Sequence, residues 1–156
     1  MQLTSEIIAG FSGSLLQKSY DQAVESPECH AEWWDLCTSK APKVAIAAPR
    51  RHAKSTAITL AYVLACLLFR NRKYALIVSD TITQATQFLG DIKKELADND
   101  RIIKLFGIKE FIKDTEDDII VAFTDGEQFR ITAKGSEQKL RGLKWNNKRH
   151  DLIVGD

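Results

Sequence analysis

The first forty residues carry apolar side chains at helical spacing. In residues 1–20 and 26–40 these side chains recur three and four positions apart, which predicts two helices. Trp33 and Trp34 are adjacent in the second helix. Because neighbouring residues point to different sides of a helix, we expect one tryptophan in the core. The other tryptophan, or His30, is then left to contact a nucleotide base or a partner.

A strand followed by a helix is predicted twice in the next part of the chain. Residues 44–47 and 74–79 are short apolar runs, typical of buried parallel strands. Residues 54–70 are apolar nearly all round, which predicts a buried helix after the first run. Asp80 or Thr81 can cap an amphipathic helix after the second run. This order predicts an α/β domain with a parallel sheet and flanking helices.

The last third of the chain predicts further strands. Residues 119–123 and 128–132 flank Asp125 and Gly126, a dipeptide that strongly favours a β-hairpin. Residues 151–156 form an apolar run that ends in a carboxylate, which predicts one more strand.

The segments between these strands are less regular. Residues 102–112 fit either a short helix or a loop, and residues 135–144 are basic and glycine-punctuated, as loops are. An acidic cluster before the hairpin is interpreted as a solvated turn rather than a metal site. It consists of Asp114, Glu116, Asp117 and Asp118.

Composition limits the class of protein but indicates no function. The 156 residues fit one domain, and 44% hydrophobic and 28% charged residues are ordinary for a globular fold. A formal charge of +1 does not by itself indicate a nucleic-acid partner. Cys29, Cys37 and Cys66 lack metal-site spacing and are typical of a reduced, intracellular protein. No signal peptide or membrane-length apolar run is visible, so we expect a soluble protein that is not secreted.

The candidate chemistry lies between the first strand and its helix. A lysine and a hydroxyl residue, Lys54 and Ser55, open that helix, as in loops that bind nucleotide phosphates through backbone amides. Alanine occupies both glycine positions of that motif, Ala48 and Ala53, which suits the motif only if neither needs a positive φ. The alternative is a basic, solvated turn. The candidate nucleotide-binding residues are Pro49, Arg50, Arg51, His52, Ala53, Lys54, Ser55 and Thr56.

A second part of the same site is predicted at the end of the chain. An aspartate at the carboxyl end of an apolar strand is the group that phosphate-loop enzymes use to hold magnesium opposite the loop hydroxyl. Asp156 has this position, so Ser55 and Asp156 are the candidate magnesium ligands.

Several motifs, in order, resemble the large terminase subunit of tailed bacteriophages, the motor ATPase that packages DNA into proheads. The first two are PECHAEWWDL (residues 27–36), on the adenine side in that family, and the glycine-poor phosphate loop APRRHAKST (residues 48–56). The others are ALIVSDTITQATQFLGDIKKEL (residues 75–96), GSEQKLRG (residues 135–142) and DLIVGD (residues 151–156). The resemblance implies a P-loop NTPase fold that uses ATP and Mg²⁺.

The resemblance also implies residue roles. Lys54 would neutralise the β and γ phosphates, and Thr56 would support the loop. Arg50 would reach the γ phosphate of its own subunit's nucleotide, and Arg141 would act as an arginine finger toward a neighbouring subunit. The alternative for both arginines is an ordinary surface or salt-bridge role.

One departure limits the expected activity. In the family, the acidic residue that activates water follows the strand-ending aspartate, and this chain stops at Asp156. The resemblance therefore implies an adenine-side helical segment (residues 1–40) and an incomplete ATPase core (residues 41–156), without the nuclease domain. Weak nucleotide binding and poor hydrolysis are expected of the chain alone. A helicase-like NTPase and a noncatalytic remnant or interaction module are the alternatives.

The implied partners are double-stranded DNA, a small terminase subunit, a portal protein and further copies in a ring, with no membrane. The implied location is the cytoplasm of an infected bacterium. A basic cluster near the end of the chain is a candidate DNA contact, with a solvated loop as the alternative. Its members are Lys134, Lys139, Arg141, Lys144, Lys148 and Arg149.

Overall fold

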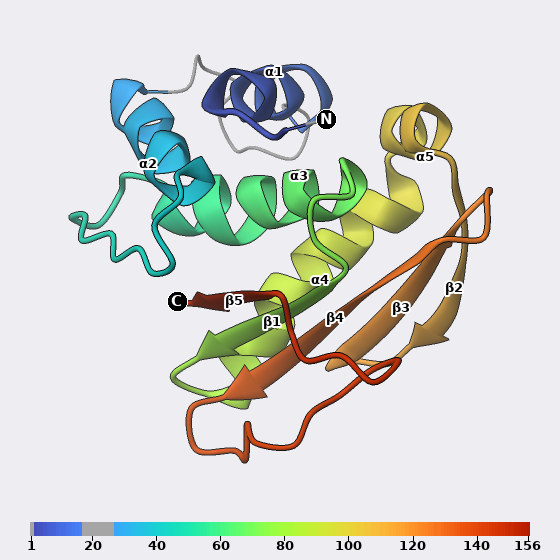
Figure 1. The fold of residues 1–156 in the computed structure, drawn as a ribbon. Coiled ribbons are helices and arrows are strands. Elements are labelled where there is room, and N and C mark those ends of the chain that lie inside the picture. Colours follow the sequence, from blue (N-terminus) through green and yellow to red (C-terminus); the bar gives the residue numbers. More distant parts are fainter. Residues whose placement is uncertain (1, 17–26) are drawn as a thin grey trace. The chain divides into compact units, whose positions relative to one another are not determined.

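The structure is a computed structural model, and it describes residues 2–16 and 27–156. The chain divides into two compact units, Met1–Asn71 and Arg72–Asp156. Figure 1 shows helices alone in the first unit, and a sheet with helices in the second. None of the described helices has the length and apolar character needed to span a membrane.

The first unit begins with two of the predicted helices. They are α1 (Ser5–Leu15) and α2 (Glu28–Thr38). The Thr4 side chain caps α1 by accepting a hydrogen bond from the Ile7 amide at 3.3 Å. Residues 1, 17–20 and 26 of the two predicted helices lie outside the described residues.

The predicted buried helix over residues 54–70 is confirmed, with one difference. It starts at Lys54 and continues through the π-helix η2 (Thr56–Tyr62) into the α-helix α3 (Val63–Leu68). Every residue from 61 to 68 is buried, in agreement with the apolar character of this segment. The π-helical turns carry no sequence signal that we recognised. Such wide turns are frequent at functional sites.

The strand predicted at residues 44–47 is wrong. These residues are irregular, and no strand is assigned to any described residue of the first unit. Val44 is 38% exposed, so its side chain does not lie in a core. Two of the four residues are alanine, which has a low strand propensity, and a strand also needs a neighbour to accept its hydrogen bonds.

The second unit is built on a mixed five-stranded sheet with the order β2-β3-β4-β1-β5. Its strands are β1 (Tyr74–Ser79), β2 (Ile108–Asp114), β3 (Asp118–Phe123), β4 (Gln128–Gly135) and β5 (Leu152–Gly155). β1 runs parallel to both β4 and β5, whereas β3 is antiparallel to β2 and β4. The α/β class with flanking helices is therefore confirmed, and the predicted parallel sheet and the predicted hairpin are parts of one mixed sheet.

Two helices connect β1 to β2. Thr81 caps α4 (Ile82–Asp98), because its side chain accepts a hydrogen bond from the Gln84 amide. α4 packs against β4 and β1 with a row of buried apolar residues. α5 (Asp100–Phe106) follows and ends at Gly107, whose φ of 71° reverses the chain into β2. The ambiguous segment 102–112 is thus half helix and half strand.

The predicted hairpin joins β3 to β4. Asp125 and Gly126 form its tip, and Gly126 has a φ of 91° that only glycine adopts easily. The Phe123 amide donates to the Glu127 carbonyl at 2.8 Å, closing the turn. The connection from β4 to β5 then runs over residues 136–151, which form turns and irregular chain as predicted for residues 135–144.

Candidate functional site

The candidate phosphate loop ends at the N-terminus of a helix. Lys54 and Ser55 form the first helical positions, and the Ala57 amide donates to the Ala53 carbonyl at 2.9 Å. Among the described residues, no acceptor binds the backbone amides of Ala53, Lys54 or Ser55. The first amides of a helix lack partners within the helix and are natural donors to an anion.

Two residues of the loop adopt left-handed backbone conformations. Arg51 has a φ of 70° and Ala53 a φ of 53°. A residue with a Cβ pays roughly 1–2 kcal/mol there, so the alanine in the second glycine position of the motif is strained. Alanine suits the two glycine positions of the motif only where φ is not positive. Ala48 meets this condition and Ala53 does not.

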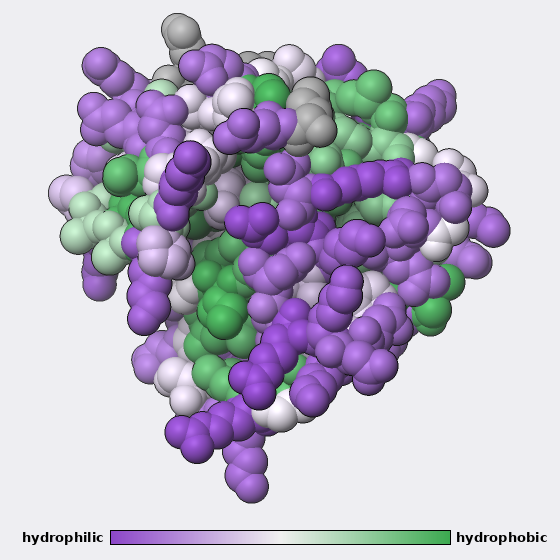
Figure 2. All heavy atoms as spheres, in the orientation of Figure 1, coloured by the Kyte–Doolittle hydropathy of each residue, from purple (hydrophilic) through white to green (hydrophobic). Residues whose placement is uncertain are grey.

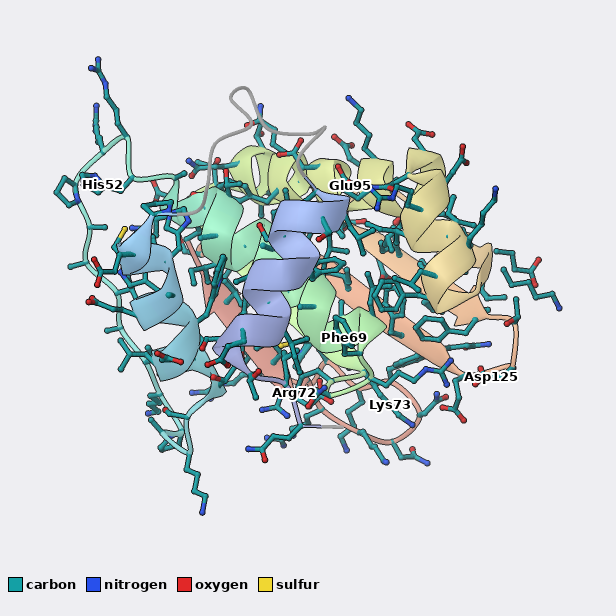
Figure 3. All side chains as sticks on the ribbon, turned by 90° about the horizontal axis from the view of Figure 1, so that it is seen from above. His52, Phe69, Arg72, Lys73, Glu95 and Asp125 are labelled. Atoms are coloured by element: carbon teal, nitrogen blue, oxygen red, sulfur yellow. The ribbon has the colours of Figure 1, made fainter. Side chains whose placement is uncertain are left out.

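The side chains of the loop face solvent. Pro49, Arg50, Arg51, His52 and Ala53 are exposed, and the next three residues, up to Thr56, are half-buried. Figure 3 shows His52 on this irregular stretch, outside the helices of the first unit. Within the described part of the chain, no ion pair or hydrogen bond engages the Lys54 ammonium or the Ser55 hydroxyl. Both groups are available to a ligand.

Helix α2 holds the loop in place through two side chains that the sequence reasoning did not assign to this task. His30 Nε2 donates to the His52 carbonyl at 2.7 Å. Trp34 Nε1 donates to the Ala57 carbonyl at 2.9 Å, inside the π-helix. A histidine and a tryptophan that lie 22 and 23 positions before their acceptors give no spacing signal for these bonds. The bonds depend on the packing of α2.

The expectation that one of the two tryptophans lies in the core is confirmed, but the other is buried as well. Trp33 and Trp34 are 8% and 1% exposed. The His30 ring lies against both, with centroids 5.0 Å and 5.8 Å apart. Both indoles are in the middle of α2 and are covered by neighbouring segments, so their adjacency did not force one of them outward.

The remaining predicted site residues belong to the second unit. Asp156 follows β5 directly, and its amide donates to the Val78 carbonyl at 2.8 Å. Its own carbonyl accepts the Ser79 hydroxyl at 2.9 Å, which fixes the end of β5 beside the end of β1. Arg141 is exposed on the β4–β5 connection, next to Gly142 with a φ of 82°.

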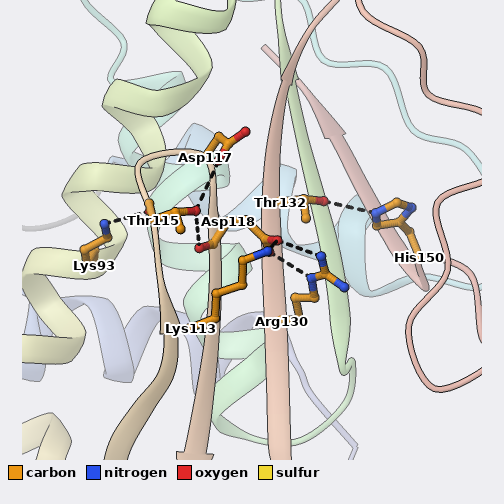
Figure 4. A network of polar contacts seen from close by, with 8 residues as sticks. All are labelled: Lys93, Lys113, Thr115, Asp117, Asp118, Arg130, Thr132 and His150. Atoms are coloured by element: carbon orange, nitrogen blue, oxygen red, sulfur yellow. Dashed lines mark hydrogen bonds and ion pairs between the residues drawn. The ribbon is translucent and has the colours of Figure 1, made fainter.

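The acidic cluster is only partly the solvated turn that the sequence predicted. Asp118 is 7% exposed and belongs to β3. Arg130 donates to both of its carboxylate oxygens, at 2.8 Å and 2.6 Å, and Lys113 donates at 2.6 Å (Figure 4). Burial opposes ionisation of Asp118, but these bonds outweigh it and lower the pKa of its carboxyl group. Its neighbour Asp117 is exposed, as predicted.

The described residues offer no preformed metal cluster of three or more His, Cys, Asp or Glu side chains. The two predicted magnesium ligands belong to different units, Ser55 to Met1–Asn71 and Asp156 to Arg72–Asp156. The face seen in Figure 2 is mostly hydrophilic, with apolar side chains in a few separate areas. Scattered apolar exposure of this kind is ordinary. The exposed large apolar residues are Leu36, Val44, Leu105, Ile112, Leu140 and Ile153.

Comparison with known proteins gives no relative. The chain matches no protein-family model, no curated protein and no solved structure.

Proposed function

We propose that this chain binds ATP with Mg²⁺ through residues 48–56, as the N-terminal ATPase part of a DNA-packaging motor of the large-terminase type. One observation carries the nucleotide part of the proposal. The open amides of Ala53, Lys54 and Ser55, the Lys54 ammonium and the Ser55 hydroxyl occur together at one helix start. A triphosphate needs this combination of donors, charge and metal ligand.

Each residue of the proposed nucleotide site has its own role. The three amides hold phosphate oxygens, and Lys54 neutralises the β and γ phosphates. Ser55 would ligate the magnesium ion that accompanies ATP. Arg50 reaches the γ phosphate from the loop, and Arg141 serves a neighbouring subunit's nucleotide. Both arginines stabilise the charge that develops during phosphoryl transfer.

The motor assignment rests on the order of the sequence motifs. It brings double-stranded DNA, a small terminase subunit, a portal protein and a ring of identical subunits as partners, and the cytoplasm of an infected bacterium as the location. ATP hydrolysis coupled to DNA translocation is the activity proposed for the whole motor. A helicase-like NTPase remains a second enzyme class with the same loop chemistry.

A noncatalytic interaction module is favoured by two observations. The strand expected before the loop is not formed, and Ala53 adopts a φ of 53° at a cost that glycine would avoid. A loop under no selection for phosphate binding tolerates both features. ATP binding decides between this module and the ATPase.

Binding of a fluorescent ATP analogue in the presence of Mg²⁺ tests the proposal. Saturable binding is expected for the wild-type chain and is lost in Lys54→Ala, because the β and γ phosphates then lack their counter-charge. Lys43→Ala, at an exposed lysine of the same unit, is the matched control and binds normally. The absence of binding to a folded wild-type chain contradicts the nucleotide proposal.

The DNA contact is proposed for the basic cluster on β4 and the β4–β5 connection. In the described residues no ion pair engages these side chains, and all except the half-buried Lys134 are exposed. Glu137 is the only acidic residue between Lys134 and Arg149. An uncompensated run of cations attracts phosphates by releasing counterions.

The salt dependence of DNA binding tests this contact. The slope of log K against log [salt] is expected to fall by about 1 for each cation removed, so Lys148→Glu with Arg149→Glu flattens it by at least about 2. Lys104→Glu on α5, outside the cluster, is the control and leaves the slope unchanged. Fluorescence anisotropy of a short duplex across a KCl series measures the slope. Equal slopes for the two variants contradict the assignment.

A further inference from the structure

The β4–β5 connection is fastened to the sheet by aromatic contacts. The Trp145 ring meets the Tyr74 ring edge-on, with centroids 5.8 Å apart. The His150 ring lies closer, with its centroid 3.9 Å from the Tyr74 centroid. Its Nε2 is 3.1 Å from Thr132 Oγ1, a contact that Figure 4 shows. Trp145 and Lys148 exchange backbone hydrogen bonds at 2.9 Å and 3.0 Å. The basic part of the connection is therefore a folded turn rather than a loose loop.

The far end of the connection is fixed independently of the histidine. The Asp151 carboxylate accepts the amides of Lys73 and Tyr74 at 2.8 Å and 2.9 Å. The Asp151 amide donates to the Tyr74 carbonyl at 3.0 Å. Loss of the His150 contact would therefore free the chain before residue 150 and leave the start of β5 in place.

The surroundings of His150 disfavour its charged form. The ring is partly buried on the sheet, and Arg130 from β4 lies 5.3 Å from the centroid of the same Tyr74 ring. Asp151 is the nearby acid that favours the charge. Burial first, and then the Arg130 charge, lower the pKa of His150 below its ordinary value of 6.5, against the opposing effect of Asp151. Arg130 stays in place because Asp118 binds it through two hydrogen bonds.

We propose that His150 is a proton-operated latch that holds the β4–β5 connection, with its exposed cations, against the sheet. The neutral ring stays between Tyr74 and Thr132, and the imidazolium leaves. Protonation thus releases the segment that carries Lys144, Lys148 and Arg149. The latch lies wholly in the second unit and does not depend on the proposed nucleotide site.

The direction of the pH effect follows from linkage. A histidine whose folded pKa is depressed stabilises the closed state fully above the unfolded pKa, near 6.5, and loses that contribution as the pH falls through the folded pKa. The opening equilibrium of the connection should therefore rise on acidification. At a pH below both pKa values of His150, the opening equilibrium constant is larger by about tenfold for each unit that separates its pKa in the open and closed states.

NMR of the nucleotide-free chain tests the latch. The His150 ring signals are titrated in the folded chain and in the chain unfolded by urea, and exchange of the Trp145 and Lys148 amides is followed over the same pH range. We expect His150 to titrate at lower pH in the folded chain. The two amides should lose protection along the same curve, after correction for intrinsic exchange.

Variants separate the latch from general acid unfolding. His150→Gln should abolish the pH-dependent step, and Thr132→Val should increase amide exchange of the connection already at neutral pH. His52→Gln, at an exposed histidine of the first unit, should leave the step intact. Protected amides in α4 confirm that each variant is folded. Titration of His150 at or above the unfolded value, unchanged amide protection, or a step that survives in His150→Gln overturns the proposal.

Discussion

The two units differ in whether their polar groups have partners within the protein. In Arg72–Asp156 the charged groups near the sheet bind one another, as the Asp118 carboxylate does with Arg130 and Lys113. In Met1–Asn71 the Lys54 ammonium and the loop amides face no partner within the described residues. Polar groups that bind one another stabilise a fold, whereas donors without a partner in the protein are available to a ligand. The contrast identifies the loop, and not the more conspicuous charge network, as the candidate binding site.

The largest expected effect comes from breaking the network of the second unit. Asp118→Asn leaves the Arg130 charge partly buried without its counter-ion, and the free energy of unfolding should fall by about 3 kcal/mol. Urea titration followed by the NMR signal of the Trp145 indole measures the change. Asp117→Asn, at the exposed neighbour, should stay within about 0.5 kcal/mol of wild type. Similar losses for both variants would show that the network is not the stabilising element.

The same carboxylate predicts an acid dependence. Its pKa is lowered in the folded state, so its contribution is complete above the unfolded pKa and is lost as the pH falls through the folded value. The stability difference between wild type and Asp118→Asn should therefore be constant near neutral pH and shrink only below about pH 4. Urea titrations at several pH values measure this difference. A difference that shrinks already between about pH 7 and pH 5 would contradict the assignment.

An intermediate effect is expected where α2 holds the loop. Trp34→Phe removes the indole donor to the Ala57 carbonyl and should cost about 1–2 kcal/mol. Native-state amide exchange, read in η2 and α3, measures the loss within the first unit. Trp33→Phe is the matched control, since the Trp33 indole donates no hydrogen bond within the described residues, and it should cost less. Equal costs would mean that packing alone, and not the hydrogen bond, secures the helix start.

The smallest effect concerns the loop backbone. Ala53→Gly removes a left-handed strain of roughly 1–2 kcal/mol and adds flexibility to the unfolded chain, for a net gain of about 0.5 kcal/mol. Ala48→Gly, where φ is not positive, should gain nothing. Thermal unfolding of the two variants gives the comparison. If Ala53→Gly destabilises as much as Ala48→Gly, the left-handed conformation is not the native one.

Prediction from sequence succeeded where local signals and burial agree. The run 74–79 forms β1, Thr81 caps α4, and Asp125 with Gly126 forms the hairpin tip. Each of these depends on residues close in the chain, whose side chains report directly on backbone geometry.

Prediction failed where the outcome depended on distant partners. Residues 44–47 have the apolar character of a strand but find no neighbouring strand among the described residues. Asp118 was grouped with its acidic neighbours because the two cations that bind it come from β2 and β4. The support of the loop by His30 was likewise invisible, since it requires α2 to pack beside residue 52. In the candidate site, the side chains that support the loop were therefore not predictable from the sequence.

The open amides of Ala53, Lys54 and Ser55 are proposed to bind nucleotide phosphates. Backbone amide chemical shifts of the ¹⁵N-labelled chain, titrated with Mg²⁺-ATP and in parallel with adenosine, test this proposal most directly. We expect saturable shifts at these three amides with ATP and none with adenosine, which has no phosphates. Unmoved amides in the folded chain, or equal shifts with both ligands, would contradict it.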